Sequence, residues 1–494
     1  MNNPPNISQF WREYPHKVLL AFDQEKEHRE IIDSELAYTM ISAGRKIQQD
    51  WEIIIQAIAD KSFFRNKTLI NTFSYARQNH SSVHLIGLLG DSNYSRVNHL
   101  IALLELAFRL NFKPVYLDLI SNNTSSSGAA TRDYLEQIQE KIAETGVGQI
   151  TSITGRSFAM TKNIEKLSLL GKMIISGQAA KADTAQWALN TASQKGQEDF
   201  EIEPTLIRTS EGIVFLREND ACIFFNFAPD FMKFFPRILF DPNLRLPGLQ
   251  KKIIPGLTIT TMTKYFKTLN TQVAFPRPQI EGNLAEIFAK YEKSNLRIGE
   301  EIKSEHITTF FNGGRKEPFA YEEREIVPSL KVNNFINFPA MSGAKITELA
   351  QAAIISKKYD FICLNFPNPD ILAHTGNIIA TGRAVKAVDN FVGQIVEENL
   401  KAQGATLIVA DHGIVEEMKG PKTKHSTNPV PFILIAKDKK RDLLKGALTI
   451  SYSTLSKLIE AKDTLSDVAP TILELLNLPK PAMMTGHSLL NKLD

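Results

Sequence analysis

Carboxylate and imidazole side chains gather in the last third of the sequence, and their spacing suits the binding of divalent metal ions. The residues concerned are Asp370, His374, Asp411, His412 and His425. Because Asp370 and His374 are four residues apart, they share one face of a helical turn and could hold one cation. A set of Asp and His ligands without thiolate suits Mn²⁺ or Zn²⁺. Five ligands could hold two ions, and paired ions are common in phosphoryl-transfer and hydrolytic enzymes.

Two short apolar segments precede these ligands and are expected to position them. Residues 361–364 come before Asp370, and residues 407–410 come directly before Asp411. Each segment has the length and the continuous apolar character of a buried parallel strand. Because ligands gather beyond the carboxyl ends of strands in open α/β sheets, we expect both clusters to lie at one edge of a sheet.

Each motif also has a purely structural interpretation. The segment Asp411-His412-Gly413 could form a turn in which Asp accepts backbone hydrogen bonds and Gly supplies a positive φ. Asp370, after Asn368 and Pro369, could cap a helix, and His425 could lie in a surface loop. The occurrence of all three motifs near consecutive predicted strands favours a metal site.

A nucleophile would complete a phosphoryl-transfer site, and Ser34 is the best candidate in the sequence. A metal ion can lower the pKa of a hydroxyl group and orient it for in-line attack. Taken alone, the segment Asp33-Ser34-Glu35 is more simply interpreted as a helix N-cap. A catalytic role for Ser34 therefore depends on the rest of the site.

Length and composition predict a soluble globular protein of two or three domains. The chain has 494 residues, of which 43% are hydrophobic and 22% charged. Its net charge of 57 − 54 = +3 argues against nucleic acid or an anionic membrane as a partner. The apolar run 430–436 is too short to span a bilayer, and residues 1–9 lack the features of a secretory signal. Cys222 and Cys363 lie in apolar runs and are expected to be core thiols of a reduced, cytoplasmic protein.

Alternating apolar strands and amphipathic helices predict an α/β fold with a largely parallel sheet. The predicted strands are residues 83–89, 114–117, 221–227, 307–311, 359–366, 405–410 and 431–436. The predicted helices are residues 98–110, 131–144 and 466–476, the last with Ser466 as its N-cap. The polar segment 121–130 is expected to be a loop, and Pro276–Pro278 suits a linker between domains.

Beyond these patterns, the sequence resembles the cofactor-independent (2,3-bisphosphoglycerate-independent) phosphoglycerate mutases of the alkaline-phosphatase superfamily. The resemblance covers nearly the whole chain and is strongest around the predicted metal ligands. The motifs that carry it are residues 365–376, 410–413, 425–431, 467–471, 484–486, 310–315, 146–148 and 225–227.

The resemblance implies a discontinuous, alkaline-phosphatase-like domain with an α/β phosphotransferase domain inserted into it. On this basis residues 1–48 and 279–494 form the metal-binding domain, and residues 49–278 form the inserted substrate domain. The family carries two Mn²⁺ ions and acts on a small phosphorylated substrate, and it suggests a monomer. We therefore expect one or two divalent ions in this protein.

Roles for individual residues follow from the same resemblance. Asp370, His374 and His425 match the ligands of one metal ion. The ligands of the other ion match Asp411 and His412 together with Ser34, the serine nucleophile. Two further residues match positions that contact the substrate. These are Arg156, a substrate-binding arginine, and Lys303, a lysine near the nucleophile whose charge would stabilise the transferring phosphoryl group.

The sequence also departs from the family pattern. Family members begin with an apolar strand ending in an Asp-Gly metal ligand, and the sequence begins beyond that strand, with Asp23 as the nearest carboxylate. After Ser34, the usual glycine and histidine are replaced. Several charged groups that would bind the substrate are replaced as well. The positions concerned are Ala37, Tyr38, Tyr94, Ile120, Lys162, Ala228 and Phe231.

These observations lead to one expected function and one alternative. The expected function is the transfer of phosphate between the 3- and 2-positions of glycerate through a phosphoserine on Ser34. The alternative is a catalytically impaired or redirected relative, because arginine recognises phosphate and carboxylate far better than apolar residues do. Such a relative would be a metal-dependent phosphomonoesterase or a non-catalytic binding or regulatory module.

Overall fold

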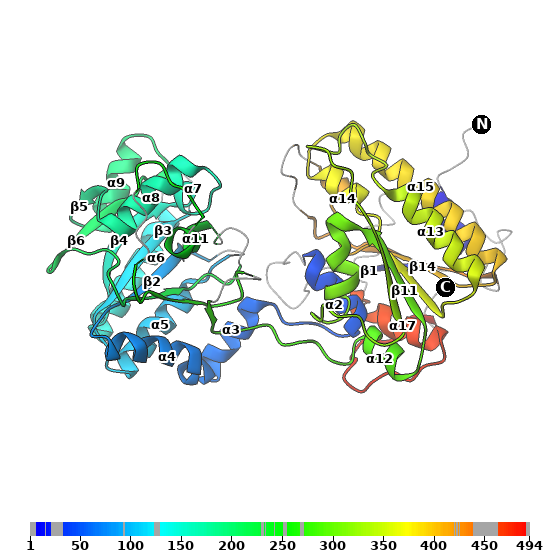
Figure 1. The fold of residues 1–494 in the computed structure, drawn as a ribbon, viewed down its shortest axis with the longest axis horizontal. Coiled ribbons are helices and arrows are strands. Elements are labelled where there is room, and N and C mark those ends of the chain that lie inside the picture. Colours follow the sequence, from blue (N-terminus) through cyan, green and yellow to red (C-terminus); the bar gives the residue numbers. More distant parts are fainter. Residues whose placement is uncertain are drawn as a thin grey trace. The chain divides into compact units, whose positions relative to one another are not determined.

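The structure is a computed structural model of the 494-residue chain, and it divides into two compact units (Figure 1). Unit 1 comprises Met1–Ile47 and Pro278–Asp494, and unit 2 comprises Gln48–Arg277. The division falls beside the proline-containing segment 276–278. The residues described are 6–14, 16–20, 33–91, 94–122, 129–228, 232, 234–241, 243–249, 254–266, 271–418, 420, 423, 425–437 and 463–490.

Unit 2 is built on one mainly parallel sheet, which has nine strands within the described part of the chain. The β6–β4 and β6–β7 pairs are antiparallel, and the other strand pairs are parallel. The strand order is β10 (Gln272–Val273), β9 (Thr258–Thr261), β8 (Ala221–Phe224), β2 (Val83–Leu89), β3 (Val115–Ser121), β4 (Gln149–Gly155), β6 (Thr205–Thr209) and β5 (Ala180–Ala182), with β7 (Gly212–Ile213) beside β6.

Helices cover this sheet with apolar side chains. They are α3 (Asp50–Ala59), η1 (Ser62–Arg65), α4 (Lys67–Gln78), α5 (Val97–Arg109), α6 (Ala129–Thr145), α7 (Arg156–Ala159), α8 (Ile164–Ser176), α9 (Ala185–Gln194), η2 (Asp199–Glu201) and α11 (Phe234–Phe240). Every residue of β2 and β3 is buried, as expected for central strands of a sheet covered on both faces. The predicted strand 83–89 is confirmed without change as β2.

Unit 1 contains two separate three-stranded sheets among its described residues. In the first, β12 (Glu322–Val327), β11 (Asn295–Glu300) and β13 (Phe361–Leu364) are all parallel. In the second, β15 (Val430–Ile435) lies between β1 (His16–Leu19) and β14 (Thr406–Val409) and is antiparallel to both. The sequence predicted that β14 is a parallel strand. Within the described residues it pairs with β15, and the pair is antiparallel, so this prediction is wrong.

Helices α13 (Gly343–Ser356) and α15 (Ile378–Lys401) pack side by side in unit 1 (Figure 1). Elsewhere in the unit, α17 (Val468–Leu475) packs against α2 (Ser34–Ala43). The remaining helical elements are α1 (Asn6–Glu13), α12 (Leu284–Lys290), η3 (Glu301–Lys303), η4 (His306–Phe310), α14 (Asn368–Ala373), η5 (Val415–Glu417) and η8 (Leu465–Asp467). No helix in the described ranges is both long and apolar enough to cross a membrane.

Several local predictions differ from the structure. Residues 307–311 were expected to be a strand, but η4 is a turn of π-helix. Ser466 was expected to cap a helix, whereas the cap is Thr464, whose hydroxyl accepts from the N–H of Ser466. The expected loop 121–130 is shorter, because Ser121 ends β3 and Ala129 begins α6, and residues 123–128 lie outside the described part.

A buried charged cluster lies between the central strands of unit 2. Nδ1 of His84 is 2.7 Å from Oδ2 of Asp118, and its Nε2 is 3.6 Å from Oδ2 of Asp220. All three side chains are buried, and Ser152 also donates a hydrogen bond to Asp118. Burial alone would lower the pKa of His84, but the two carboxylates raise it to about 9. The imidazole is therefore held as a buried cation at neutral pH.

This cluster makes the stability of unit 2 depend on pH. Because the folded-state pKa of His84 is raised from 6.5 to about 9, its stabilisation is fully present below pH 6.5 and is lost as pH rises through 9. The size of this shift corresponds to about 3 kcal/mol in the free energy of unfolding. Urea unfolding, followed by tryptophan fluorescence, to which Trp51 and Trp187 of unit 2 contribute, is expected to show wild type approaching His84→Gln in stability as pH rises. A wild-type advantage that stays constant with pH would contradict this assignment.

Candidate metal centre

Three side chains of unit 1 converge to form a triangle of possible metal ligands. Nε2 of His374 lies 3.2 Å, and Nε2 of His425 lies 3.4 Å, from Oδ1 of Asp370. The two Nε2 atoms are 3.3 Å apart. Asp370 lies in the first turn of α14 and His374 is the C-cap of that helix, so the spacing of four residues places them on one face as predicted. No other cluster of three or more His, Cys, Asp or Glu ligands occurs in the described ranges.

The geometry of this triangle fits a divalent ion. Donors that each lie about 2.1 Å from one ion in a tetrahedral arrangement are about 3.4 Å from one another. Nδ1 of His374 is 2.8 Å from the carbonyl oxygen of Thr423 and can donate to it, which leaves the lone pair of Nε2 directed at the triangle. Both carboxylate oxygens of Asp370 are buried and have no partner with hydrogen-bond geometry in the described part of the protein. Such an arrangement is typical of a site that receives a cation.

The electrostatics of the triangle keep Asp370 ionised. Burial alone would raise the pKa of this carboxyl, but its close contacts with the imidazoles of His374 and His425 and the charge of Lys303 hold its pKa far below its usual range. Nζ of Lys303 is 2.9 Å from Oδ2 of Asp370. The same carboxylate raises the pKa of His374. A permanent negative charge is therefore available to a metal ion at any physiological pH.

Ser34 lies beside this triangle and is not the helix cap. Asp33 is the N-cap of α2, since its side chain accepts from the N–H of Leu36, and Ser34 is the first helical residue. The buried Oγ of Ser34 is 2.8 Å from Nε2 of His412 and 3.2 Å from Nζ of Lys303. The segment therefore does cap the helix, through Asp33, while the hydroxyl of Ser34 faces His412 and Lys303, and its catalytic role stays a prediction.

A second group of donors adjoins the first. The ring of His412 stacks on the ring of His425 with centroids 3.5 Å apart, and its Nε2 is 3.4 Å from Oδ2 of Asp411. Burial lowers the pKa of His412, which favours the neutral imidazole that can act as a ligand. This second group therefore offers three possible metal ligands, namely Asp411, His412 and the hydroxyl of Ser34. Asp23 lies outside the described residues.

Sequence reasoning missed some features of the site. The carbonyl of Thr423 orients His374, and no sequence signal could identify it because every residue has a carbonyl. Tyr38 was noticed only as a departure from a family motif, yet its hydroxyl accepts from the amide of Asn365 and its ring packs edge-on against His306. Burial and the nearby Asp411 raise the pKa of Tyr38 well above its usual value, so it stays neutral. The aromatic residue therefore forms one wall of the site without adding charge.

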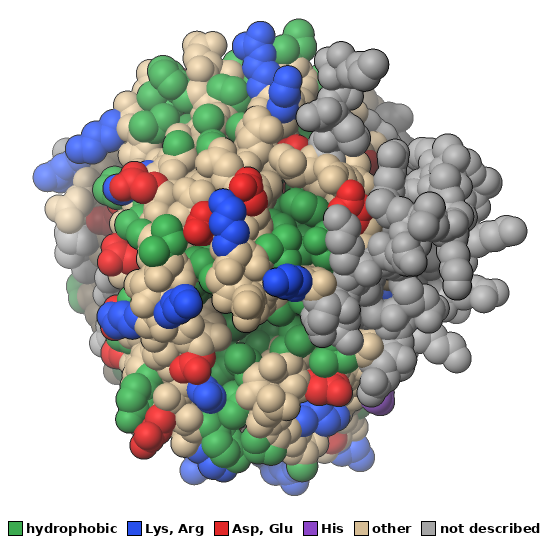
Figure 2. Space-filling view, turned by 90° about the vertical axis from the view of Figure 1, so that its right-hand side faces the viewer, with side chains coloured by type: hydrophobic (Ala, Val, Ile, Leu, Met, Phe, Trp, Pro, Cys, Tyr) green, Lys and Arg blue, Asp and Glu red, His purple; other side chains and the backbone are tan. Residues whose placement is uncertain are grey.

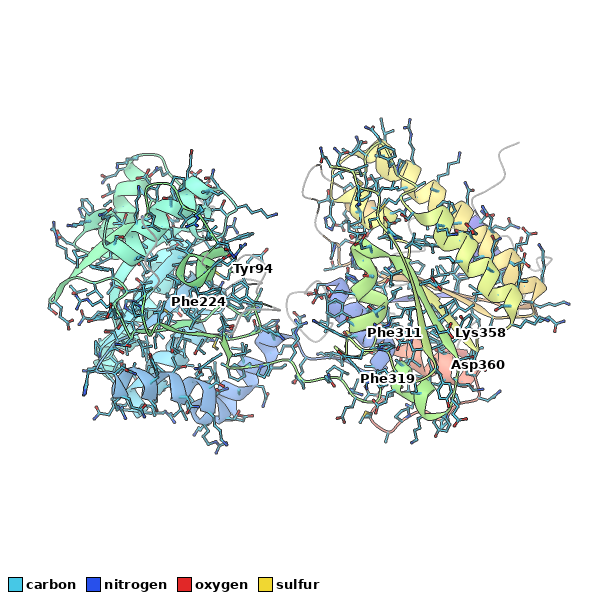
Figure 3. The ribbon with its side chains drawn as sticks, in the orientation of Figure 1. Tyr94, Phe224, Phe311, Phe319, Lys358 and Asp360 are labelled. Carbon is cyan, nitrogen blue, oxygen red and sulfur yellow. The ribbon has the colours of Figure 1, made fainter. Side chains whose placement is uncertain are left out.

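The remaining residues expected to contact the substrate belong to unit 2. Arg156 begins α7, and its guanidinium carbon is 6.0 Å from the centre of the Phe200 ring. Tyr94, labelled in Figure 3, packs against the apolar cluster of unit 2 that contains Phe224. Ile120 is fully buried and Lys162 is exposed. Phe231 lies outside the described residues.

Comparisons with known proteins extend over nearly the whole chain. The Metalloenzyme superfamily model matches residues 25–480. The 2,3-bisphosphoglycerate-independent phosphoglycerate mutase of Clostridium botulinum (strain Langeland) is 35% identical over 99% of this chain and 94% of the relative. The protein of that name from Clostridioides difficile is 34% identical over the same shares. The chain belongs to the 2,3-bisphosphoglycerate-independent phosphoglycerate mutase family.

A solved structure confirms the predicted fold of this family member. The crystal structure of Leishmania mexicana phosphoglycerate mutase at low cobalt concentration matches 99% of the chain with a TM-score of 0.66. The match covers 93% of that protein at 23% identity. The fold is therefore the expected α/β architecture of a metalloenzyme, an alkaline-phosphatase-like domain with an inserted domain.

Removing the negative charge of Asp370 should weaken metal binding without preventing the protein from folding. Asp370→Asn keeps the shape of the side chain but removes the anionic ligand, so the affinity for Mn²⁺ is expected to fall at least about 100-fold. Equilibrium dialysis followed by elemental analysis would measure this. The exposed histidine variant His487→Ala is the control and should bind Mn²⁺ as wild type does. Unchanged Mn²⁺ binding by Asp370→Asn would show that the triangle is not the metal site.

Proposed function

We propose that this protein catalyses metal-dependent transfer of phosphate between the 3- and 2-positions of glycerate through a phosphoserine on Ser34. Membership of the phosphoglycerate mutase family supports the reaction, since relatives bearing that name match almost the full chain. The observation that carries the proposal is the position of Ser34. Its hydroxyl lies between His412 and Lys303, at 2.8 Å and 3.2 Å, next to the Asp370 triangle.

We assign the first metal ion to Asp370, His374 and His425, and the second to Asp411, His412 and Ser34. The mixture of carboxylate and imidazole donors suits Mn²⁺. A bound divalent ion supplies Lewis-acid stabilisation of charge on phosphoryl oxygens. The protein's own side chains supply the nucleophile, the positive charge beside it and the contact with the substrate.

Lys303 is placed to act on both the serine nucleophile and the transferred phosphoryl group. Its Nζ donates to Oγ of Ser34 and also contacts Asp370 at 2.9 Å, which holds the ammonium in position. A fixed positive charge beside the attacking oxygen stabilises negative charge that develops there and on the transferred group. Arg156 in unit 2 is the proposed contact for the substrate, because a guanidinium binds phosphate or carboxylate in a bidentate manner.

The first test removes the nucleophile. Ser34→Ala is expected to abolish the conversion of 3-phosphoglycerate into 2-phosphoglycerate in the presence of Mn²⁺, because no phosphoserine can form. Thr39→Ala removes a different hydroxyl from the same helix and is expected to keep wild-type activity. A coupled assay that consumes 2-phosphoglycerate would measure both variants. Equal turnover by wild type and Ser34→Ala would refute the assignment.

The second test removes the charge beside the nucleophile. Lys303→Met keeps the length of the side chain and is expected to lower kcat about 100-fold or more, the usual effect of losing one oriented group that stabilises the transition state. Lys345→Met removes an exposed lysine that is paired with Glu348 and should leave kcat unchanged. Steady-state kinetics of the two variants would decide. A normal kcat for Lys303→Met would mean that the ammonium does not act in the chemical step.

A redirected activity is the second candidate, and the residues of unit 2 favour it. Tyr94, Ile120 and Ala228 occupy positions where the family resemblance leads us to expect groups that bind the substrate. The side chain of Ile120 is fully buried and could not contact a phosphate. With fewer cations to retain phosphoglycerate, the phosphoserine would be hydrolysed, and the protein would act as a phosphomonoesterase. Phosphate release that requires Ser34 without formation of 2-phosphoglycerate would establish this alternative, and metal binding without either reaction would indicate a binding module.

A further inference from the structure

The segment that follows β14 and the segment that precedes β15 run side by side next to the metal centre. The first carries His412 and then Gly413, and the second carries His425 and then Ser426. Gly413 and Ser426 form an isolated antiparallel bridge, in which the N–H of Ser426 donates to the carbonyl oxygen of Gly413 at 2.7 Å. The two imidazole rings stack with centroids 3.5 Å apart. Because each proposed set of metal ligands contains one of these histidines, the alignment of the two segments determines how the two sets face each other.

The side chain of Glu416 makes a second connection between these segments. Its Oε2 accepts a hydrogen bond from the N–H of Ile414 at 3.0 Å, in the segment after β14. Its Oε1 accepts from the hydroxyl of Ser426 and, at 3.1 Å, from the side-chain amide of Asn428, both in the segment before β15. A single backbone hydrogen bond would let the segments pivot about it, whereas the carboxylate adds contacts at further points along both.

The donors of these hydrogen bonds hold the carboxylate in place. Glu416 lies at the surface, as do the acidic side chains visible on the face of the molecule in Figure 2, but Ile414 and Ser426 are buried. A buried N–H or hydroxyl group that loses its acceptor costs free energy, which favours the position where both donors reach the carboxylate. Desolvation would raise the pKa of Glu416, but its hydrogen bonds, above all that from Ser426, lower it below its usual value. The side chain is therefore an anion at neutral pH, and hydrogen bonds to a charged acceptor are stronger than those between neutral groups.

Gly413 leaves room for this connection. A Cβ atom at that position would overlap Oε1 of Glu416 and Oγ of Ser426. Within the described part of the chain, Gly413 is not among the residues with positive φ, so the interpretation of this glycine as a turn residue with positive φ is wrong. The close approach of a carboxylate and a hydroxyl group requires glycine here.

We propose that Glu416 is a positioning residue that aligns His425 with His412 and so holds the two sets of metal ligands in a fixed arrangement. The proposal rests on the metal ligands proposed above, and it assigns Glu416 no contact with an ion or with the substrate. The carboxylate acts through the backbone of the two segments that carry the histidines. Without it, the segments would be joined mainly by the bridge between Gly413 and Ser426, and the imidazoles could shift relative to each other.

The neighbouring Glu417 offers a matched control. It carries the same charge one residue along the chain, and it is also exposed. Within the described residues its carboxylate accepts one hydrogen bond, from the side-chain amide of Asn428 at 3.1 Å. A glutamine at this position can still accept that hydrogen bond, so Glu417→Gln removes a charge without removing the connection.

Glu416→Gln tests the proposal through the affinity for Mn²⁺. The substitution keeps the size of the side chain but replaces one acceptor oxygen by an NH₂ group, which cannot accept from Ile414 or Ser426. The affinity is expected to fall about tenfold or more, the usual effect of losing a group that orients a metal ligand. Glu417→Gln is expected to bind Mn²⁺ within about twofold of wild type, because an exposed charge is screened by salt. Equilibrium dialysis would measure both variants, and equal losses in the two would show that only the charge matters and would overturn the proposal.

The spectrum of a bound ion separates positioning from general stability. Co²⁺ in place of Mn²⁺ gives visible absorption bands that depend on the arrangement of its ligands. With the sites saturated, Glu416→Gln is expected to change these bands, and Glu417→Gln should leave them as in wild type. A lower melting temperature of Glu416→Gln with an unchanged spectrum of the bound ion would assign Glu416 a structural role only and would contradict the proposal.

Ser426→Ala provides a milder change, which decides the question if Glu416→Gln does not fold. It removes the hydroxyl donor and leaves the carboxylate in place, and circular dichroism checks that the variant folds. Ser426→Ala is expected to weaken Mn²⁺ binding and to change the Co²⁺ bands as Glu416→Gln does. In the double variant the two losses of affinity are expected not to add, because both substitutions break the same connection. Normal binding and a normal spectrum for Ser426→Ala, or fully additive losses, would count against the proposal.

Asp370→Asn distinguishes failure of this proposal from failure of the metal assignment. If Asp370→Asn loses Mn²⁺ binding while Glu416→Gln keeps wild-type affinity, the metal centre stands and the positioning role is rejected. If Asp370→Asn binds Mn²⁺ as wild type does, the metal assignment and the positioning role are rejected together.

Discussion

The carboxylate of Asp370 is the charge on which the arrangement of unit 1 depends. Its oxygens are buried, and removing a carboxylate from water is costly unless cationic or hydrogen-bonding groups compensate. Two of the compensating groups, Lys303 and His425, come from distant parts of the sequence, and the third, His374, caps the helix that carries Asp370. The need to neutralise this one charge therefore holds η3, α14 and the loop before β15 in a single site, with Ser34 next to it through the shared contact with Lys303.

The same site explains why the two sheets of unit 1 are oriented as they are. Strands β13 and β14 are not paired with each other, yet both deliver their following residues to one place. The imidazoles of His412 and His425 stack at 3.5 Å and connect the segments that follow β14 and precede β15.

The two units differ in how they treat buried charge. In unit 1 the charged groups surround a place that can receive an ion, and in unit 2 the charge of His84 lies beside the carboxylates of Asp118 and Asp220. Asp118 is contacted by His84 at one oxygen and accepts hydrogen bonds from Thr151 and Ser152 at the other. The metal-binding donors retained in unit 1 support a mutase. The apolar residues of unit 2, such as Ile120, are the reason for also considering a redirected phosphatase.

Much of the fold and of the site could be predicted from local sequence features. The alternation of strands and helices predicted the α/β class, and the apolar segment 83–89 predicted β2 to the residue. The helical spacing of Asp370 and His374 predicted their shared face, and ordered motifs along the chain identified the family. Residues 307–311 were wrongly expected to be a strand, because a short segment of β-branched and aromatic residues is also compatible with a buried helical turn.

The sequence by itself therefore determined the residue types that can hold a divalent ion, the helix that presents two of them, and the family to which the chain belongs. Only the tertiary structure decided that β14 pairs antiparallel with β15, that Thr423 orients His374, and that the edges of β13 and β14 face a common cleft. The physical reason is that periodicity and capping act between neighbours in the chain. Packing between segments that lie far apart in sequence decides which strands pair and which groups hydrogen-bond to a metal-binding side chain. The sequence of an apolar strand is the same whether its edge is paired or open.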